Sequence, residues 1–145
     1  MDFRRASAKD APRIAEIEAE TFSDPWSYRA VCDCICTEGA MCFVAESEGE
    51  IVAYWLGRLI PPEGELYRVA VIPKYRRRGI AYRLLDYGAK CSRGDGLETL
   101  FLEVRSENTA AYGLYCAFGF KPVARRRGYY KSPDDDAIVM IKERA

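Results

Sequence analysis

Residues 69–85, which read VAVIPKYRRRGIAYRLL, carry the strongest structural signal in this chain. The run begins as an apolar, strand-like segment ending at Pro73, passes through a turn rich in arginine and glycine, and continues as a helix. Such a turn leaves several backbone N–H groups unpaired at the helix N-terminus, where a pyrophosphate can bind. The arginines at 76–78 add positive charge beside it. The stretch therefore predicts a binding site for a phosphorylated cofactor.

Two other interpretations of this turn stay open when the stretch is taken alone. The first is an ordinary helix start whose arginines are merely exposed to solvent. The second is a patch that binds nucleic acid, but the stretch lacks the interleaved aromatic residues, and the chain lacks the basic excess, that such patches normally show. The choice between a cofactor site and a plain helix start therefore depends on the rest of the sequence.

The composition is that of an ordinary globular protein. The 145 residues are 49% hydrophobic, and 22 basic residues balance 22 acidic ones. Without a net charge there is no overall field to attract nucleic acid or an anionic membrane, so we expect neither as a partner. No apolar run approaches the roughly 20 residues that span a bilayer, and no apolar signal region follows the N-terminus. We expect a single domain over residues 1–145, cytoplasmic, with free thiols.

Histidine is absent from the chain, which removes several kinds of catalytic site. A Ser-His-Asp triad, a Cys-His nucleophile pair and the His-based zinc motifs are all excluded. Proton transfer must then use Glu, Asp, Tyr, Lys, Cys or water. The cluster Cys32, Cys34 and Cys36 invites a metal interpretation, but on a helix Cys34 would point away from the other two, and no second ligand cluster follows. We therefore expect no metal.

The hydrophobic periodicity predicts a mixed sheet with helices on both of its faces. The hairpin signals favour antiparallel pairing, whereas the strand-helix-strand units of the second half favour some parallel pairing. Ser7 and Ser27 are expected to cap the first two helices, and residues 61–64 to break the chain. The expected strands are residues 2–6, 41–47, 51–60, 65–72, 99–104, 120–130 and 137–141, and the later helices are residues 28–37, 79–92 and 108–118.

Three residues after the second strand-helix unit are candidates for chemistry. Glu103 stands alone among apolar strand residues; if the strand is covered on both faces, burial would raise the pKa of this carboxyl group toward a useful range. The alternative is a Glu at the strand end paired with an arginine. Asn108 and Tyr115 lie two turns apart on one helix face, roughly 10 Å along its axis. Asn108 also suits the helix cap, and Tyr115 is either a general acid or a core tyrosine with a satisfied hydroxyl.

Taken together, these motifs resemble one known family. The strand, the Arg-Arg-x-Gly-x-Ala turn with its helix, Leu-Glu-Val-Arg at 102–105, Asn108, and Leu-Tyr-x-x-x-Gly-Phe at 114–120 match the GNAT superfamily of acetyl-CoA-dependent N-acetyltransferases in order and spacing. Within it, the chain most resembles the bacterial ribosomal-protein alanine N-acetyltransferases, and Arg-Gly-Tyr-Tyr at 127–130 adds to that match. The resemblance implies an α/β (α+β) GNAT fold with a mostly antiparallel sheet of about seven strands.

The resemblance also implies a role for each site residue. Glu103 would be the general base, acting through a water molecule, and Tyr115 would protonate the departing CoA thiolate. The acetyl group would go to a protein N-terminal α-amino group, that of the N-terminal alanine of a small-subunit ribosomal protein. No covalent acyl-enzyme is required, in agreement with the missing histidine. The residues implied to bind acetyl-CoA are Val69, Ala70 and Val71 for the pantetheine arm, Arg77, Arg78, Gly79, Ile80, Ala81 and Tyr82 for the pyrophosphate, and Asn108 for the pantetheine as it passes the last helix.

The sequence departs from the close relatives' pattern in one strand, and other functions stay open. Tyr-Arg-Val-Ala-Val at 67–71 replaces the usual Leu-Asn-Ile-Ala-Val, so Arg68 could change which acceptor fits. Glu65 on this strand is a second candidate base, since many relatives place a base there. The alternatives are a GNAT enzyme that acetylates a small-molecule amine or a lysine side chain, and a CoA-binding module without catalysis.

Overall fold

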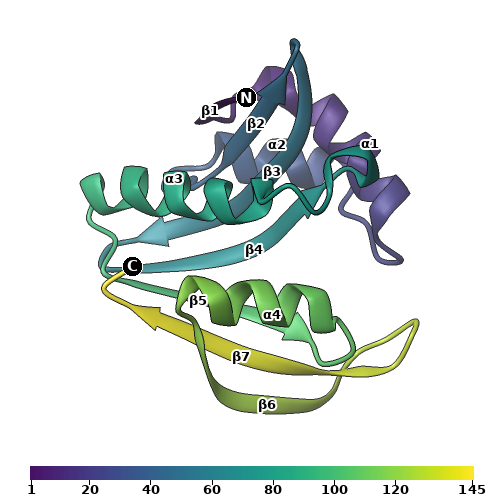
Figure 1. The fold of residues 1–145 in the computed structure, drawn as a ribbon, viewed down its shortest axis with the longest axis vertical. Coiled ribbons are helices and arrows are strands. Elements are labelled where there is room, and N and C mark those ends of the chain that lie inside the picture. Colours follow the sequence, from purple (N-terminus) through teal and green to yellow (C-terminus); the bar gives the residue numbers. More distant parts are fainter.

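The protein folds around one mixed sheet of seven strands in the order β1-β2-β3-β4-β5-β7-β6. The computed structural model describes residues 1–145 (Figure 1). All neighbouring strands pair antiparallel except β4 and β5, which are parallel. The strands are β1 (Asp2–Arg5), β2 (Phe43–Ser47), β3 (Glu50–Ile60), β4 (Glu63–Val71), β5 (Thr99–Arg105), β6 (Lys121–Tyr130) and β7 (Asp135–Glu143). The helices are α1 (Ala11–Thr21), α2 (Tyr28–Cys36), α3 (Ile80–Gly94) and α4 (Thr109–Phe118).

The sheet is forked between its two parallel strands. β4 and β5 pair only from Glu63 with Thr99 to Leu66 with Leu102, although β4 continues to Val71 and β5 to Arg105. Beyond the fork, β4 pairs only with β3, and β5 only with β7. Figure 1 shows the two strands separating, so that the sheet opens on one side. A sheet that splits in this way leaves unpaired backbone groups inside the molecule, where a ligand can reach them.

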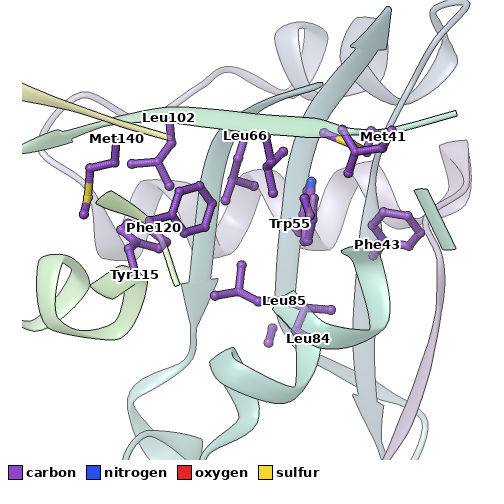
Figure 2. Close-up of a cluster of buried hydrophobic side chains, with 14 of the residues drawn as sticks. Met41, Phe43, Trp55, Leu66, Leu84, Leu85, Leu102, Tyr115, Phe120 and Met140 are labelled. Carbon is purple, nitrogen blue, oxygen red and sulfur yellow. The ribbon is translucent and has the colours of Figure 1, made fainter. Parts of the chain in front are cut away.

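Each face of β3 is buried under different helices, α3 on one face and α1 and α2 on the other. Ala53 and Trp55 point into the larger hydrophobic cluster, which α3 and α4 cover, whereas Tyr54 and Leu56 point into a second cluster under α1 and α2. This alternation follows from the period of two along a strand. Because both faces are covered, β3 lacks the polar side of a surface strand and is apolar over most of its length. Figure 2 shows the larger cluster around Trp55.

The predicted order of strands and helices, the mixed sheet and the helices on both faces are confirmed. Ser27 caps α2 by accepting a hydrogen bond from the N–H of Ala30, as predicted. None of the four helices is long and apolar enough to cross a membrane.

Two predicted boundaries were wrong. Residues 61–64 are not all loop, because the chain reverses at residues 61–62 and β4 already begins at Glu63, which pairs with Ile60 and Thr99. β7 begins at Asp135 and ends at Glu143, well outside the predicted 137–141. The ends of β7 are polar, so apolar periodicity does not reveal them, but backbone pairing with β5 and β6 extends the strand.

A small residue lets α3 pack closely on the sheet. A Cβ atom on Gly88 would lie 2.5 Å from Cζ3 of Trp55 and 3.0 Å from Cδ2 of Phe43, and both of those rings are buried. The Gly88→Ala substitution should therefore overpack the core and lower the free energy of unfolding by about 1–3 kcal/mol. The midpoint of thermal unfolding should fall by about 2–10 °C.

Gly94 in the same helix provides the control for this prediction. A Cβ there has nothing within 4 Å, so Gly94→Ala should leave stability unchanged or raise it by up to about 1 kcal/mol. Equal melting temperatures for the two alanine variants would contradict the packing argument.

Candidate active site

The arginine-glycine turn before α3 presents a row of free backbone donors. Gly79 and Arg77 both have positive φ, 74° and 62°, which turns successive N–H groups toward one side of the chain. None of the backbone N–H groups of residues 77–82 donates a backbone hydrogen bond. The left-handed conformation at Gly79 is free of strain because glycine has no Cβ. This geometry is what an anion-binding turn requires.

The three arginines of the turn have different surroundings. Nε of Arg76 donates to the carbonyl oxygen of Val71 at 2.9 Å and so ties the turn to the end of β4. The guanidinium carbon of Arg78 lies 4.9 Å from the ring centre of Tyr75. Arg77 and Arg78 are exposed to solvent. Their charges are therefore held beside the free N–H groups of the turn.

The open edge of β4 begins at the fork of the sheet. Val69, Ala70 and Val71 pair with Trp55, Tyr54 and Ala53 of β3, and β5 has diverged on their other side. An unpaired strand edge offers N–H and C=O groups to any extended chain that lies alongside it. The edge leads from the fork toward the turn before α3, since β4 ends at Val71 and that turn follows eight residues after it at Gly79.

A cavity of about 220 Å³ lies at the fork, on the side of α1 and α2. Its lining is acidic and aromatic, and it includes Leu66, the last residue of β4 to pair with β5. The other lining residues are Asp24, Trp26, Glu65, Tyr67, Arg68, Glu103, Tyr129 and Tyr130. We call this cavity the acceptor pocket, because the amine that the predicted base Glu103 would deprotonate is expected there. A larger cavity of about 560 Å³ lies around Arg58 and Asp95, but none of the predicted site residues lines it.

Glu103 faces the acceptor pocket and is not fully buried, contrary to the prediction. Its side chain keeps 24% of its surface exposed because the pocket opens at this point of β5. Its Oε2 atom is buried without a hydrogen-bond partner, and Nε of Arg126 lies 3.6 Å away. The alternative interpretation, a Glu near an arginine, thus agrees with the structure, and the role of Glu103 as general base stays a prediction.

A second carboxylate, Glu65 on β4, lies across the same pocket. Burial raises its pKa, the negative charge of Glu103 raises it further, and Arg126 acts in the opposite direction. Two carboxylates that influence each other in this way resist being ionised together. Glu65 therefore keeps its proton to a higher pH than an exposed glutamate does.

Tyr115 is directed from α4 into the larger hydrophobic cluster. Its ring packs on Phe120 at 5.6 Å between ring centres, and Figure 2 shows the two side chains together. Burial raises the pKa of Tyr115 well above its usual range, and the charge of Tyr130 adds to this effect while Arg68 opposes it. Tyr130 and Arg68 both line the acceptor pocket. Tyr115 itself does not line that pocket, and its hydroxyl stays protonated at neutral pH.

Asn108 is the N-cap of α4. Its Oδ1 accepts a hydrogen bond from the N–H of Ala111 at 3.1 Å, which satisfies one of the free donors at the helix start. The predicted cap is confirmed, and the side-chain NH₂ group remains available on the same residue. On α4, only Tyr115 is buried, whereas Ala111, Leu114 and Phe118 lie half-buried at the rim of the cluster.

The sequence did not point to the buried carboxylate that supports the pocket. Glu18 of α1 has no exposed surface and accepts hydrogen bonds from the Tyr54 hydroxyl at 2.5 Å and the Trp26 N–H at 2.9 Å. Nε of Arg68 lies 3.3 Å from it. Glu18 directly follows Ile17, which belongs to the buried stripe of α1. A charged residue beside such a stripe is the sequence signal that could have revealed the buried carboxylate.

The cysteines are free thiols, as predicted. Cys34 and Cys42 approach each other, with their sulfur atoms 3.7 Å apart, whereas Cys36 is exposed on the surface of α2. No group of three or more His, Cys, Asp or Glu side chains is placed to hold a metal ion.

Comparison with known proteins gives consistent matches along nearly the whole chain. Residues 7–120 match the Acetyltransferase (GNAT) family. The chain is 38% identical over 140 residues to the N-alpha-acetyltransferase RimI of Mycobacterium tuberculosis (strain ATCC 25618 / H37Rv), covering 92% of this chain and 87% of that one. It is 33% identical over 135 residues to the ribosomal protein bS18-alanine N-acetyltransferase of Escherichia coli (strain K12), covering 90% and 89%. The crystal structure of the Escherichia coli ribosomal-protein-S18-alanine N-acetyltransferase superimposes with a TM-score of 0.93 at 29% identity, covering 99% and 94%.

Proposed function

Since this chain belongs to the GNAT family and is an acetyl-CoA-dependent N-acetyltransferase, we propose that its acceptor is the N-terminal alanine of a small-subunit ribosomal protein. The Escherichia coli relative is named for that reaction on bS18. Acetylation of a ribosomal protein puts the enzyme in the cytoplasm, where ribosomes are assembled.

One geometric observation carries the proposal. The fork of the sheet joins the open edge of β4, which suits an extended thioester arm, to the acceptor pocket that holds Glu103. A cofactor arm on one side of the fork and an amine on the other would meet at Leu66 and Leu102. Proximity and orientation of the two reactants supply a large part of the rate enhancement in such a transfer.

Acetyl-CoA binding uses the main chain more than side chains. The pantetheine arm lies along Val69, Ala70 and Val71 as a short extra strand, and its pyrophosphate accepts hydrogen bonds from the free N–H groups of residues 77–82, beside Arg77 and Arg78. The side-chain amide of Asn108 contacts the arm from the start of α4. The support is the set of unpaired backbone donors in the turn and along the strand edge.

The chemical step is a direct transfer without an acyl-enzyme. An α-ammonium group has a pKa of about 7.7–8.0, so a carboxylate such as Glu103, acting through a water molecule, is a sufficient base. The freed amine nitrogen attacks the thioester carbonyl carbon and forms the C–N bond. The tetrahedral intermediate then expels the CoA sulfur, which takes the hydroxyl proton of Tyr115. The nitrogen loses its second proton as the amide forms, and a proton returned through solvent restores the Tyr115 hydroxyl. Glu65 is the alternative base, because its carboxyl group faces the same pocket and has a raised pKa.

An acceptor assay tests the function directly. A peptide with a free N-terminal alanine and acetyl-CoA should give CoA release, and mass spectrometry should locate the new acetyl group on the α-nitrogen. The same peptide with a blocked N-terminus but free lysines is the matched control and should give no product. If the protein binds CoA but releases none above background with the free peptide, the acceptor assignment is wrong. Activity on free small amines but not on peptides would favour a small-molecule acetyltransferase.

A further inference from the structure

The acceptor pocket has two walls that are remote in sequence. The α1–α2 loop (residues 22–27) contributes Asp24 and Trp26, and the end of β6 contributes Tyr129 and Tyr130, next to the β6–β7 loop (residues 131–134). No backbone ladder joins these two walls, because β6 pairs only with β7, at the far edge of the sheet. The separation of the walls must therefore be set by side chains.

Each wall is anchored separately to its own part of the fold. The α1–α2 loop is held by Glu18, which accepts from the Trp26 N–H, and by Arg68, which donates to the carbonyl oxygen of Asp24. The base of the β6–β7 loop is held by Asp135, which accepts from the Ser106 hydroxyl and, at 3.1 Å, from the N–H of residue 107. Neither set of contacts reaches the opposite wall.

Arg105, the last residue of β5, contacts both walls. Its Nη1 donates to the carbonyl oxygen of Pro133 at 2.8 Å and its Nη2 to that of Lys131 at 3.2 Å. Its guanidinium carbon lies 4.4 Å from the ring centre of Tyr130. On the other side, Nη2 lies 3.9 Å from Oδ2 of Asp24, whose Oδ1 is 3.5 Å from Nη2 of Arg68. The carboxylate of Asp24 thus lies between two guanidinium groups.

We propose that Arg105 and Asp24 form a positioning pair that sets the separation of the two walls and so controls how the acceptor N-terminus fits. Because the pocket belongs to the acetyl transfer argued above, the kinetic part of this inference rests on the proposed function. Neither residue needs to touch the reacting atoms. The carboxylate of Asp24 faces the guanidinium groups of Arg68 and Arg105, and Glu65 and Glu103 line the same pocket.

The geometry favours a positioning role over simple support of one loop. The side chain of Arg105 is only 19% exposed, whereas that of Asp24 is 45% exposed. The two hydrogen bonds to the carbonyl oxygens of Pro133 and Lys131 hold the planar guanidinium group of Arg105 in one orientation. Because Asp135 still anchors the β6–β7 loop when Arg105 is lost, substitution should loosen the rim of the pocket without unfolding the hairpin. The cofactor turn lies at the start of α3, away from these contacts.

The kinetic test separates acceptor binding from cofactor binding. In the Arg105→Gln variant, the KM for the alanine peptide should rise about tenfold, while the KM for acetyl-CoA and the Kd for CoA stay within about twofold. Asp24→Asn should raise the peptide KM in the same direction. Adding Asp24→Asn to Arg105→Gln should change it by less than about twofold further, since the two residues act as one unit. Arg105→Lys keeps the positive charge but loses the planar guanidinium group with its paired donors. Its KM for the peptide should therefore lie between those of the wild type and Arg105→Gln.

Two matched substitutions control for loss of charge alone. Arg125→Gln removes an arginine of the edge strand β6 that pairs with Asp136. Asp95→Asn removes an aspartate that pairs with Arg5. Neither Arg125 nor Asp95 lines the acceptor pocket. Both variants should keep the wild-type peptide KM.

Hydrogen–deuterium exchange tests the link without any acceptor. In Asp24→Asn, amide exchange should increase in residues 131–134 as well as in residues 22–27, although Asp24 reaches the β6–β7 loop only through Arg105. Exchange that increases in residues 22–27 alone would overturn the proposal, as would an unchanged peptide KM in Arg105→Gln or fully additive effects in the double variant. If the wild type fails to acetylate the peptide, the proposed acceptor is wrong, and the exchange result still decides whether the two walls are coupled.

Discussion

Replacing Glu103 with Gln should lower kcat/KM for the peptide acceptor by about 10²- to 10⁴-fold, the usual contribution of a general base. The amide keeps the size of the side chain but cannot take a proton from the ammonium group or from a water molecule. CoA binding should be unchanged, because Glu103 lies in the acceptor pocket and the free backbone donors of the cofactor turn lie before α3. The measurement is steady-state kinetics with both substrates varied, together with calorimetric titration of CoA.

The defect should depend on pH in a defined direction. Below the pKa of the acceptor amine, about 7.7–8.0, most of the amine is protonated and the base is needed. Above it the free amine is already present, so the ratio of wild-type to variant rates should shrink as the pH rises. A ratio that stays flat across pH would contradict a base role for Glu103.

Two further variants make the assignment of the base specific. Glu65→Gln tests the neighbouring carboxylate, and a larger loss there than in Glu103→Gln would transfer the role to Glu65. Glu63→Gln, at the start of the same strand and outside the pocket, is the matched control and should behave as the wild type.

Replacing Tyr115 with Phe should lower kcat by about 10²-fold, because the CoA thiolate would leave without a proton donor. The ring that packs on Phe120 is kept, so the folded structure should not be destabilised. The KM for acetyl-CoA should change little, since only the hydroxyl is lost. Single-turnover kinetics with a saturating peptide would measure the chemical step directly.

The raised pKa of Tyr115 adds a pH prediction with a definite sign. Burial stabilises the neutral phenol, so the group keeps its proton above the ordinary tyrosine pKa of about 10. The wild type should therefore show no loss of kcat from Tyr115 ionisation up to about pH 10. An alkaline loss near pH 9 that disappears in Tyr115→Phe would contradict the buried, protonated state.

A second tyrosine of the same helix provides the control. Tyr112→Phe removes a hydroxyl one turn away on α4 and should leave kcat unchanged. Equal losses in both variants would mean that the effect comes from the helix and not from proton donation.

Several structural features could be predicted from short stretches of sequence because they depend on local contacts. The turn at Gly79, the cap at Ser27 and the cap at Asn108 each involve residues within a few positions of each other. The alternation along β3 is also local, and it separates Trp55 from Tyr54. Such features are set by backbone sterics and nearby hydrogen bonds, so the sequence is enough to reveal them.

Other features were missed because they depend on partners far along the chain. Glu18 is buried only because Tyr54 and Arg68 approach it from β3 and β4. The length of β7 depends on its two neighbours, not on its own apolar pattern. The expected burial of Glu103 was wrong because the cover over that face of β5 has an opening there.

By itself, the sequence determined the element order and the conformation of the turn before α3, and it singled out the candidates for proton transfer. Only the tertiary structure decided where β4 and β5 part, and thereby which side chains share the acceptor pocket. The reason is physical. A turn is specified by the torsion angles of a few adjacent residues, whereas the extent of strand pairing depends on the competition among all the layers packed around the sheet. That competition ends the β4–β5 ladder at Leu66 and Leu102, and it brings Asp24, Arg105 and Glu103 together from distant parts of the chain.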